Sequence, residues 1–349
     1  MTGDVRQRLL APMSPDSPQD FALAFLSILF EGVPFILLGT LISGFIDVYL
    51  PPGMMDRFLP KNKYLAVLTA GLLGAVFPVC ECAVVPVIRR LVKKGLPVSC
   101  ALTYMLAAPI VNPITALSTW KAFQGQGAAM MTSSRMLLGF LIAVAVGVVV
   151  SKLRISAVLK PKLLEMLKKD AARVSRPETS HAGHDHSCCG HDPSDADHDH
   201  HDHHDHGPTG ENRMVMAFRA ALKDFVEVGV YFTIGVSITA LFNTGIAPGA
   251  QWLDSLAKNP AAAPAALMAL AFILSLCSTS DAFIAATLDK FSWGAKLAFL
   301  TFGPMMDVKL IFLYQTVLTK RFIILLAIGL FLAIGGISIF WQQLLFQAQ

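Results

Sequence analysis

The chain has 349 residues, of which 54% are hydrophobic and only 15% are charged, and its mean hydropathy is +0.57. Soluble domains carry about 25% charged residues, so this composition excludes an ordinary soluble protein. The net charge is +4, and the basic residues lie in segments that flank apolar runs, so nothing suggests a nucleic-acid partner.

Eight apolar runs are long enough to cross a bilayer whose hydrocarbon core is about 30 Å thick. The first is too long for the core of a signal peptide, which indicates a retained helix. We therefore predict an all-α polytopic membrane protein with about eight transmembrane helices. The runs cover residues 21–49, 64–90, 97–123, 130–152, 218–243, 262–288, 294–318 and 321–345. The predicted domains are a cytoplasmic N-terminus (1–20), a first transmembrane repeat (21–152), a polar loop (153–213) and a second repeat (214–349).

The two halves resemble each other in sequence and indicate a duplication. FEGVPFILLGTLISGF (30–45) aligns with VEVGVYFTIGVSITAL (226–241), and AAPIVNPI (107–114) aligns with FGPMMDVK (302–309). PVCECAV (78–84) takes the place of LCSTSDA (276–282). Four crossing spans in each half would give parallel repeats, whereas a re-entrant second span would give inverted repeats; both schemes occur in transporters.

The segment PVCECAVVP (78–86) combines two thiols with one carboxyl group inside an apolar run. Pro78 and Pro86 cannot donate backbone hydrogen bonds, so we expect the helix to kink or unwind between them. In an extended segment, residues two apart point to the same side. Cys80 and Cys82 can then bind one soft ion together, beside Glu81. The alternative is two small buried cysteines next to a structural kink.

A second predicted helix break recurs in both halves. Pro109 and Pro113 surround Asn112 in the first half, and Pro304 precedes Asp307 in the second. Paired breaks at matching positions point to a transport site near the midplane. The alternative for Asn112 is a hydrogen bond between helices.

Further ionisable or polar residues lie inside apolar runs, where they are costly unless they face a cavity or a partner. Asp281, Glu31 and Glu227 belong to this group. Proton relay, metal coordination and helix pairing are all open for the two glutamates. The apolar runs contain no histidine, so an intramembrane proton relay has to use carboxylates. The chain also lacks a GxxxxGK[ST] loop, so nothing suggests ATP hydrolysis.

All ten histidines lie in one stretch, HAGHDHSCCGHDPSDADHDHHDHHDH, between residues 181 and 206. Imidazole, thiolate and carboxylate groups are ligands for zinc and copper. We expect this tract to bind such a metal; the alternative is a solvated low-complexity linker. No resident cofactor is required. The candidate loop ligands are His181, His184, His186, Cys188, Cys189, His191, His198, His200, His201, His203, His204 and His206.

The distribution of basic residues predicts an orientation. Arg6, Arg8, the cluster from Arg89 to Lys94 and the basic central loop put both termini and the histidine tract in the cytoplasm. The Lys61–Lys63 pair is discordant with this scheme. The basic residues that it puts on the opposite side are Arg57, Lys61, Lys63, Lys121, Arg135, Lys258, Lys320 and Arg321.

Residues 78–114, together with CSTSDAF (277–283) and FGPMMD (302–307), resemble the predicted permease family that includes bacterial organoarsenical efflux permeases. The resemblance implies an eight-span inner-membrane exporter of metals or metalloids, driven by an ion gradient. It also implies that paired membrane cysteines bind a trivalent metalloid. Cys80 and Cys82 are in those positions, with Cys100 as a possible third thiol. The histidine tract resembles that of a copper/zinc efflux subgroup.

We therefore expect a secondary efflux transporter for zinc or copper, coupled to protons because thiolates and carboxylates lose protons when they bind metal. One alternative is export of trivalent arsenicals. An intramembrane thiol redox enzyme and a membrane-anchored metal sensor are alternatives of other classes. Besides the cargo and the lipid bilayer, a homo-oligomer is a possible partner.

Overall fold

The computed structural model describes residues 18–50, 59–76, 79–161, 163–165, 213–245, 259 and 262–346. Within these ranges every regular element is a helix, apart from one isolated antiparallel bridge between Leu159 and Leu318. The predicted all-helical architecture is confirmed. The histidine tract, with Cys188 and Cys189, lies outside the described residues, as does Pro78.

In the part of the chain that the structure describes, each half has a long helix, four short helices and a second long helix, in that order. In the first half these are α2 (Pro18–Tyr49), α4 (Lys63–Val76), α5 (Glu81–Lys93), α6 (Val98–Ala107), α7 (Pro113–Ala122) and α8 (Ala128–Ser151), followed by the single turn α9 (Ile155–Val158). In the second half they are α11 (Arg213–Gly245), α13 (Ala262–Leu274), α14 (Ser280–Thr287), α15 (Trp293–Phe302), α16 (Val308–Tyr314) and α17 (Lys320–Phe346).

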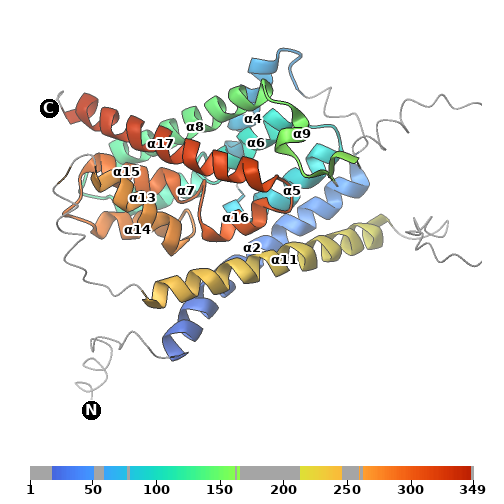
Figure 1. Ribbon diagram of the computed structural model, residues 1–349, viewed down its shortest axis with the longest axis horizontal. Coiled ribbons are helices and arrows are strands. Elements are labelled where there is room, and N and C mark those ends of the chain that lie inside the picture. The colour runs from blue at the N-terminus through green and yellow to red at the C-terminus, as the bar shows by residue number, and fades with distance from the viewer. Residues whose placement is uncertain are drawn as a thin grey trace, which may run out of the picture.

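The first long helices of the two halves, α2 and α11, pack along each other in opposite directions (Figure 1). Phe45, near the end of α2, meets Phe218, near the start of α11, with ring centroids 6.1 Å apart. Further along, Gly32 of α2 faces the Phe232 ring of α11. Contacts between a late residue of one helix and an early residue of the other require an antiparallel pair.

The last long helices, α8 and α17, are also antiparallel. The indole nitrogen of Trp341, late in α17, donates to the hydroxyl of Ser134, early in α8, at 3.1 Å. At the other end, Leu159, which follows α8, pairs with Leu318, which precedes α17. Equivalent helices of the two halves therefore run in opposite directions, so the repeats are inverted.

The second predicted span of the first half, 64–90, does not run from one end of the molecule to the other. Early in α4, Val67 contacts Gly147 near the end of α8; late in α4, Gly74 meets Ala108 in the middle of the core. Helix α5 then returns to the end from which α4 came. These two helices form a re-entrant hairpin, which is the condition under which we expected inverted repeats.

The second half contains the equivalent hairpin, entering from the opposite end. Ala271, late in α13, lies against Gly303 in the middle of the core. After α14, Asp289 lies 3.9 Å from Lys296 of α15. Helix α15 begins beside the end of α17, where the backbone of Gly294 donates to Gln342. The predicted span 262–288 is thus re-entrant too. The tips of the two hairpins meet near the centre.

Four described helices are long and apolar enough to cross a membrane: Phe21–Tyr49, Ala128–Ser151, Arg213–Leu241 and Lys320–Gln343. The prediction that the termini share a side with the central loop does not fit their directions. Helices α2 and α8 both run toward the end where the loop begins, which we call the loop end. Pro18 and Phe346 belong to the opposite end. The reason is that each half crosses the core an odd number of times, because its second span turns back.

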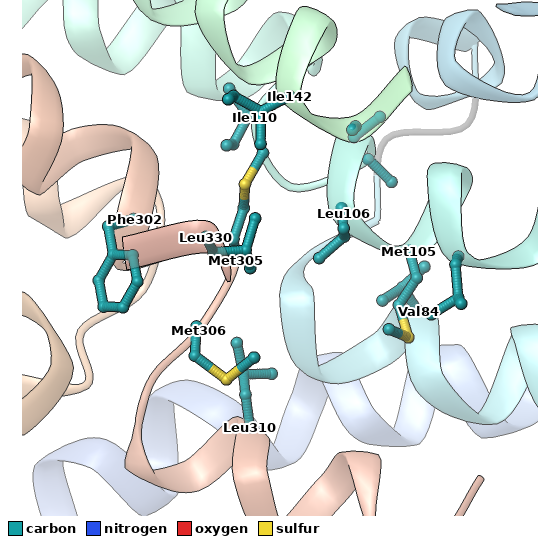
Figure 2. Close-up of a cluster of buried hydrophobic side chains, with 14 of the residues drawn as sticks. Val84, Met105, Leu106, Ile110, Ile142, Phe302, Met305, Met306, Leu310 and Leu330 are labelled. Carbon is teal, nitrogen blue, oxygen red and sulfur yellow. The ribbon is translucent and has the colours of Figure 1, made fainter. Parts of the chain in front are cut away.

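Buried hydrophobic side chains from both halves form one apolar core (Figure 2). Met105, Met305 and Met306 belong to it and are at most 1% exposed. Figure 2 shows the Met306 side chain beside Leu310 and the Met105 side chain beside Val84. These sulfur atoms pack against aliphatic groups, so the methionines act here as core residues.

Candidate functional site

Helix α5 begins directly after Cys80, whose backbone is extended (φ −74°, ψ 167°). Glu81 and Cys82 already belong to the first helical turn. Among the described residues of this segment, the predicted unwinding covers Val79 and Cys80 but not the residues from Glu81 to Pro86. Pro86 was expected to break the helix, but α5 continues through it. A proline removes its own backbone donor and crowds the carbonyl four residues before it, and the burial of α5 among neighbouring helices offsets that cost.

The other prolines divide between breaks and helix starts. Pro109 and Pro304 lie in the non-helical segments between α6 and α7 and between α15 and α16, as predicted. The carbonyl of Pro109 accepts a hydrogen bond from the Thr115 hydroxyl at 2.9 Å. Pro113 is instead the first residue of α7, a position where a missing N–H costs nothing.

Three thiols border one small central cavity. Cys80 and Cys82 reach it from α5, and Cys277 reaches it from the tip of the second hairpin. The cavity is also lined by Glu31 from α2 and Lys309 from α16. All four described cysteines are free thiols. Cys100, the possible third thiol, is buried on α6 and does not line this cavity.

Lys309 bridges the two halves at the cavity. Its ammonium group donates to the carbonyls of Ser275 (2.8 Å) and Leu276 (3.0 Å), where α13 has ended. It also lies 3.3 Å from a Glu81 carboxylate oxygen and 3.4 Å from Asp307. Freed carbonyls at a broken helix are groups that bind a coupling cation in other transporters. Here a tethered ammonium occupies them.

A second buried ion pair lies behind the first. Arg135 of α8 has its guanidinium 3.8 Å from Asp281 of α14. The same guanidinium donates to the Thr119 hydroxyl at 2.8 Å and to the Ser278 carbonyl at 2.9 Å. Arg135 is 1% exposed. It therefore ties the second hairpin to α7 and α8.

The central acids outnumber the central bases. Glu31 is not among the buried groups. Of the groups that are buried, Glu81, Asp281 and Asp307 face Arg135 and Lys309, so this buried cluster has a net charge of −1 when all five groups are ionised. One oxygen of each of the three carboxyl groups is buried and accepts no hydrogen bond from the described residues. Buried carboxylates need compensation, so the cluster has room for one proton or one further cation.

Asn112 and Asp307 perform the same structural task in the two halves. Each is the N-cap of the short helix after the break: Asn112 accepts from the backbone of Ile114 at 2.9 Å, and Asp307 from that of Leu310 at 2.6 Å. A side-chain oxygen at an N-cap satisfies an otherwise unpaired donor. The predicted symmetry of these two residues is thus visible in the geometry. Asp307 alone also carries a charge.

The two symmetric glutamates lie in different surroundings. Glu31 borders the central cavity and accepts a hydrogen bond from Ser280 at 2.8 Å. Glu227 is paired with Arg89 of α5 at 2.7 Å and lies nearer the loop end. Glu31 is therefore a residue of the central site and Glu227 is not.

A larger cavity of about 590 Å³ opens at the loop end, and we call it the vestibule. Charged side chains dominate its wall: Asp47, Arg89, Arg90, Lys93, Lys160, Lys223, Asp224 and Glu227. The Arg89–Glu227 pair and a cluster around Arg90 lie in this wall. These charged groups line the vestibule at the loop end.

Among the described residues, no three His, Cys, Asp or Glu side chains are close enough together to hold a metal ion. The thiols and carboxyl groups thus line a cavity without forming a tight ligand cage in this conformation. The candidate loop ligands, His181 to His206, lie outside the described residues.

Two groups of functional candidates were missed in the sequence. Arg135 was counted as a basic residue that flanks a membrane run, although it follows Met130 and Met131 within an apolar segment and should have been treated as an intramembrane charge. Asp224 and Arg90 lie 134 positions apart and their pairing has no local signature. Only the inverted packing of α2 and α11 brings them together.

The chain was also compared with known proteins. A model of a family described as "Predicted permease" matches residues 19–339. The protein YcgR of Bacillus subtilis, from the family UPF0718, is 34% identical over 303 residues, which cover 86% of this chain and 90% of YcgR. A Streptococcus mutans protein named as a two-component membrane permease complex subunit is 30% identical over 89% of this chain and 91% of its own length. No solved structure matches the chain.

Proposed function

Because this chain belongs to the predicted permease family, and is thus a multi-pass membrane transporter rather than an enzyme, we propose that it exports a thiophilic metal ion such as copper or zinc. The central cavity is the cargo site in this proposal. The observation that carries it is the convergence of Cys80, Cys82 and Cys277 on one buried cavity.

The ligand chemistry of the cavity favours a soft cargo. Thiolates bind Cu⁺ and Zn²⁺, and hard cations prefer oxygen ligands. Glu81 is already paired with Lys309, so it adds little attraction for a hard divalent cation. The two thiols of α5 and the thiol of the second hairpin come from opposite halves. A change in the hairpin positions would bring them closer or separate them, which is how cargo would be bound and released.

A trivalent organoarsenical is the second candidate. Three thiols without an intramembrane histidine suit a trivalent arsenic centre, which binds sulfur and does not need imidazole. The Lys309–Glu81 pair leaves little net charge beside the thiols, and this suits a neutral cargo. The measurement below separates the two cargo classes.

Proton coupling is supported by the central charge cluster. Its surplus carboxyl group can carry one proton, and Lys309 occupies the helix-end carbonyls at which a sodium ion would otherwise bind. We propose that the proton is exchanged at Asp281, Asp307 and Glu81, and that cargo and proton move in opposite directions.

For the topology we propose six crossings, formed by the four long helices and by the broken pairs α6–α7 and α15–α16, with two re-entrant hairpins. The loop end is then cytoplasmic. The first scheme put Lys61, Lys63, Lys320 and Arg321 on the opposite side, but they lie at or next to the starts of α4 and α17 and so belong to the loop end. The excess of basic residues at the loop end is then larger. The positive-inside rule places the loop end in the cytoplasm and both termini on the other side of the inner membrane.

Topology reporters test this arrangement directly. A reporter that is active only outside the cytoplasm should be active when fused after residue 346 and inactive when inserted in the 166–212 segment. Equal activity at both positions would contradict the inverted arrangement.

The histidine tract and a partner subunit complete the proposal. The tract would capture cytosolic metal close to the vestibule, and its ligands are those identified in the sequence. The Streptococcus mutans relative is named as a subunit of a two-component complex. We propose that this chain likewise works beside a second membrane subunit or a second copy of itself.

Elemental analysis of cells that lack their own exporters tests the cargo. Cells expressing the chain should hold less of one element among Zn, Cu and As than cells without it. The Cys80→Ser/Cys82→Ser variant should lose this effect, and Cys100→Ser, which changes a buried thiol outside the cavity, should keep it. Equal content of every element in all four strains would contradict export of a thiophilic cargo.

A further inference from the structure

The two inverted halves are not packed symmetrically. Helix α2 lies on α5 of its own half, whereas α11 lies on α16 and not on α14, which is the counterpart of α5. Gly39 permits the first contact, because a Cβ there would lie 2.7 Å from the Cα of Ala83. Gly235 permits the second, at 2.8 Å from the Cα of Lys309. The α2–α11 pair therefore covers α5 and α16.

The counterparts of the covered helices are left more open. Every residue of α5 from Glu81 to Ile88 is buried. In α14 the buried residues are Asp281, Ala282 and Ala285, and Phe283 is 53% exposed. In α7, Ile114 and Leu117 are 55% and 60% exposed. The core thus offers two equivalent faces, and the pair occupies one of them.

An ion-pair cluster holds the pair on its present face. The Arg90 guanidinium binds both carboxylate oxygens of Asp224 (2.9 and 3.0 Å) and one oxygen of Asp47 (2.7 Å). The Ser43 hydroxyl donates to Asp224 at 2.9 Å. We call these four residues the Arg90 clamp. It joins α5, α2 and α11 where the vestibule meets the core, and its bidentate, charge-assisted bonds are among the stronger kinds of hydrogen bond.

Among the described side chains, the opposite end shows no equivalent clamp. The alignment places Leu288 at the counterpart of Arg90 and Ile28 at that of Asp224. Thr239 is the counterpart of Ser43, and its hydroxyl is fully buried without a hydrogen-bond partner among the described residues. Ser43 satisfies its own hydroxyl on Asp224 and on the carbonyl of Pro86. In the alignment, the counterpart of the Pro86 carbonyl is the carbonyl of Ile284 in α14.

We propose that the α2–α11 pair exchanges between two positions on the core, and that the Arg90 clamp is the gate that holds the position seen here. In the second position, related by the inverted symmetry, α11 lies on α14 and α2 lies on α7. Thr239 then donates to the carbonyl of Ile284, which satisfies its hydroxyl. Moving the pair off α5 opens the central cavity to the vestibule. Arg90 and Asp224 are positioning residues in this account and do not touch the cargo.

This inference rests on the permease function and not on the identity of the cargo. Its first test is therefore a conformational readout that does not require transport, and a transport measurement on the linked proteins follows it. A Thr239→Cys/Ile284→Cys variant is treated with a bifunctional thiol reagent, and linked peptides are identified by mass spectrometry. Linkage should be slow in this variant and about tenfold faster when Arg90→Gln is added, because at least two charge-assisted hydrogen bonds that hold the first position are lost.

A Phe45→Cys/Phe218→Cys variant is the matched control, because these residues join α2 to α11 within the moving pair. The crosslink between positions 45 and 218 should form at the same rate whether residue 90 is Arg or Gln. An equal rate also shows that the Arg90→Gln chain is folded. This crosslink should leave transport intact, whereas linkage between 239 and 284 should stop transport until the link is reduced.

Two results would overturn the proposal. One is a 239–284 linkage rate that Arg90→Gln leaves unchanged; the other is loss of transport when 45 and 218 are linked. If Arg90→Gln does not fold, Asp47→Asn takes its place. That change removes only the more exposed arm of the clamp, and it should raise the 239–284 linkage rate about threefold, since one charge-assisted bond is weakened. An unchanged rate in Asp47→Asn overturns the proposal equally.

Discussion

At the tip of the first hairpin the chain carries Cys80 and Cys82, whereas the equivalent tip of the second hairpin carries Ser278 and Ser280. After the second break, Asn112 in the first half is matched by Asp307 in the second, and Ile114 is matched by Lys309. The backbone plan of the two halves is the same. One half supplies most of the thiols and the other supplies most of the charge, so duplication provided the scaffold and later divergence separated its chemistry.

The largest expected effect comes from removing the charge that is unique to the second half. Lys309→Met leaves Glu81 and Asp307 buried without their cation, which should lower the free energy of unfolding by about 3–5 kcal/mol. Ile114→Met, at the matching position of the first half, should change it by less than about 1.5 kcal/mol. Thermal unfolding in detergent compares the two variants.

A second substitution provides the control for this unfolding experiment. Adding Glu81→Gln to Lys309→Met removes one unpaired charge and should recover part of the lost stability. A Lys309→Met protein as stable as the wild type would show that the second half does not depend on a buried charge that the first half lacks.

Asp281→Asn should affect transport more than folding. Arg135 keeps its hydrogen bonds to Thr119 and to the Ser278 carbonyl, so the scaffold should lose only about 1 kcal/mol. An asparagine at this position cannot release or take up a proton, so transport driven by a pH gradient should fall at least about tenfold. This is a lower bound on the effect that a positioned proton-transfer group has on a rate. Unaltered gradient-driven flux in proteoliposomes would remove Asp281 from the proton path.

Asp307→Asn makes the second half resemble the first. The amide oxygen can still cap α16, as Asn112 caps α7, and Lys309 keeps Glu81 as a partner. The stability should therefore fall by only about 1 kcal/mol. Asp307→Ala, which also removes the cap, should cost about 1 kcal/mol more. Chemical unfolding of the two variants in the same detergent distinguishes the cap from the charge.

The smallest effect is expected from the segment that joins the halves. A chain without residues 181–206 should retain export within about twofold at saturating metal, because the tract raises the local concentration of metal and does not form the pathway. The difference should grow at low cytosolic metal. Complete loss of export would favour a metal sensor over a transporter.

Much of the fold was predictable from the sequence, because apolar length and duplicated motifs are local signals. The two breaks at Pro109 and Pro304 and the pairing of Asn112 with Asp307 followed from those motifs. The re-entrant course of 64–90 did not, because a helical pair that turns back and one that crosses have the same hydropathy. Because the sequence could not show whether the second span turns back, it predicted termini on the same side as the central loop. The proposed topology puts them on the opposite side.

The site was predictable only in part, and for a related reason. The CxC segment indicated two thiols close together, but Cys277 joins them only through the meeting of the two hairpin tips. Lys309 was visible as a charge in an apolar run, whereas its contacts with Ser275 and Leu276 depend on where α13 ends. Contacts between residues far apart in the sequence leave no periodic pattern.

X-ray absorption spectroscopy of the purified chain without residues 181–206, loaded separately with Cu⁺, Zn²⁺ or a trivalent phenylarsenical, tests the central claim most directly. We predict one bound centre per chain with two or three sulfur neighbours, retained in Cys100→Ser and lost in Cys80→Ser/Cys82→Ser. A centre with only nitrogen and oxygen neighbours, or sulfur coordination that survives the double substitution, would contradict a cargo site at the first hairpin tip.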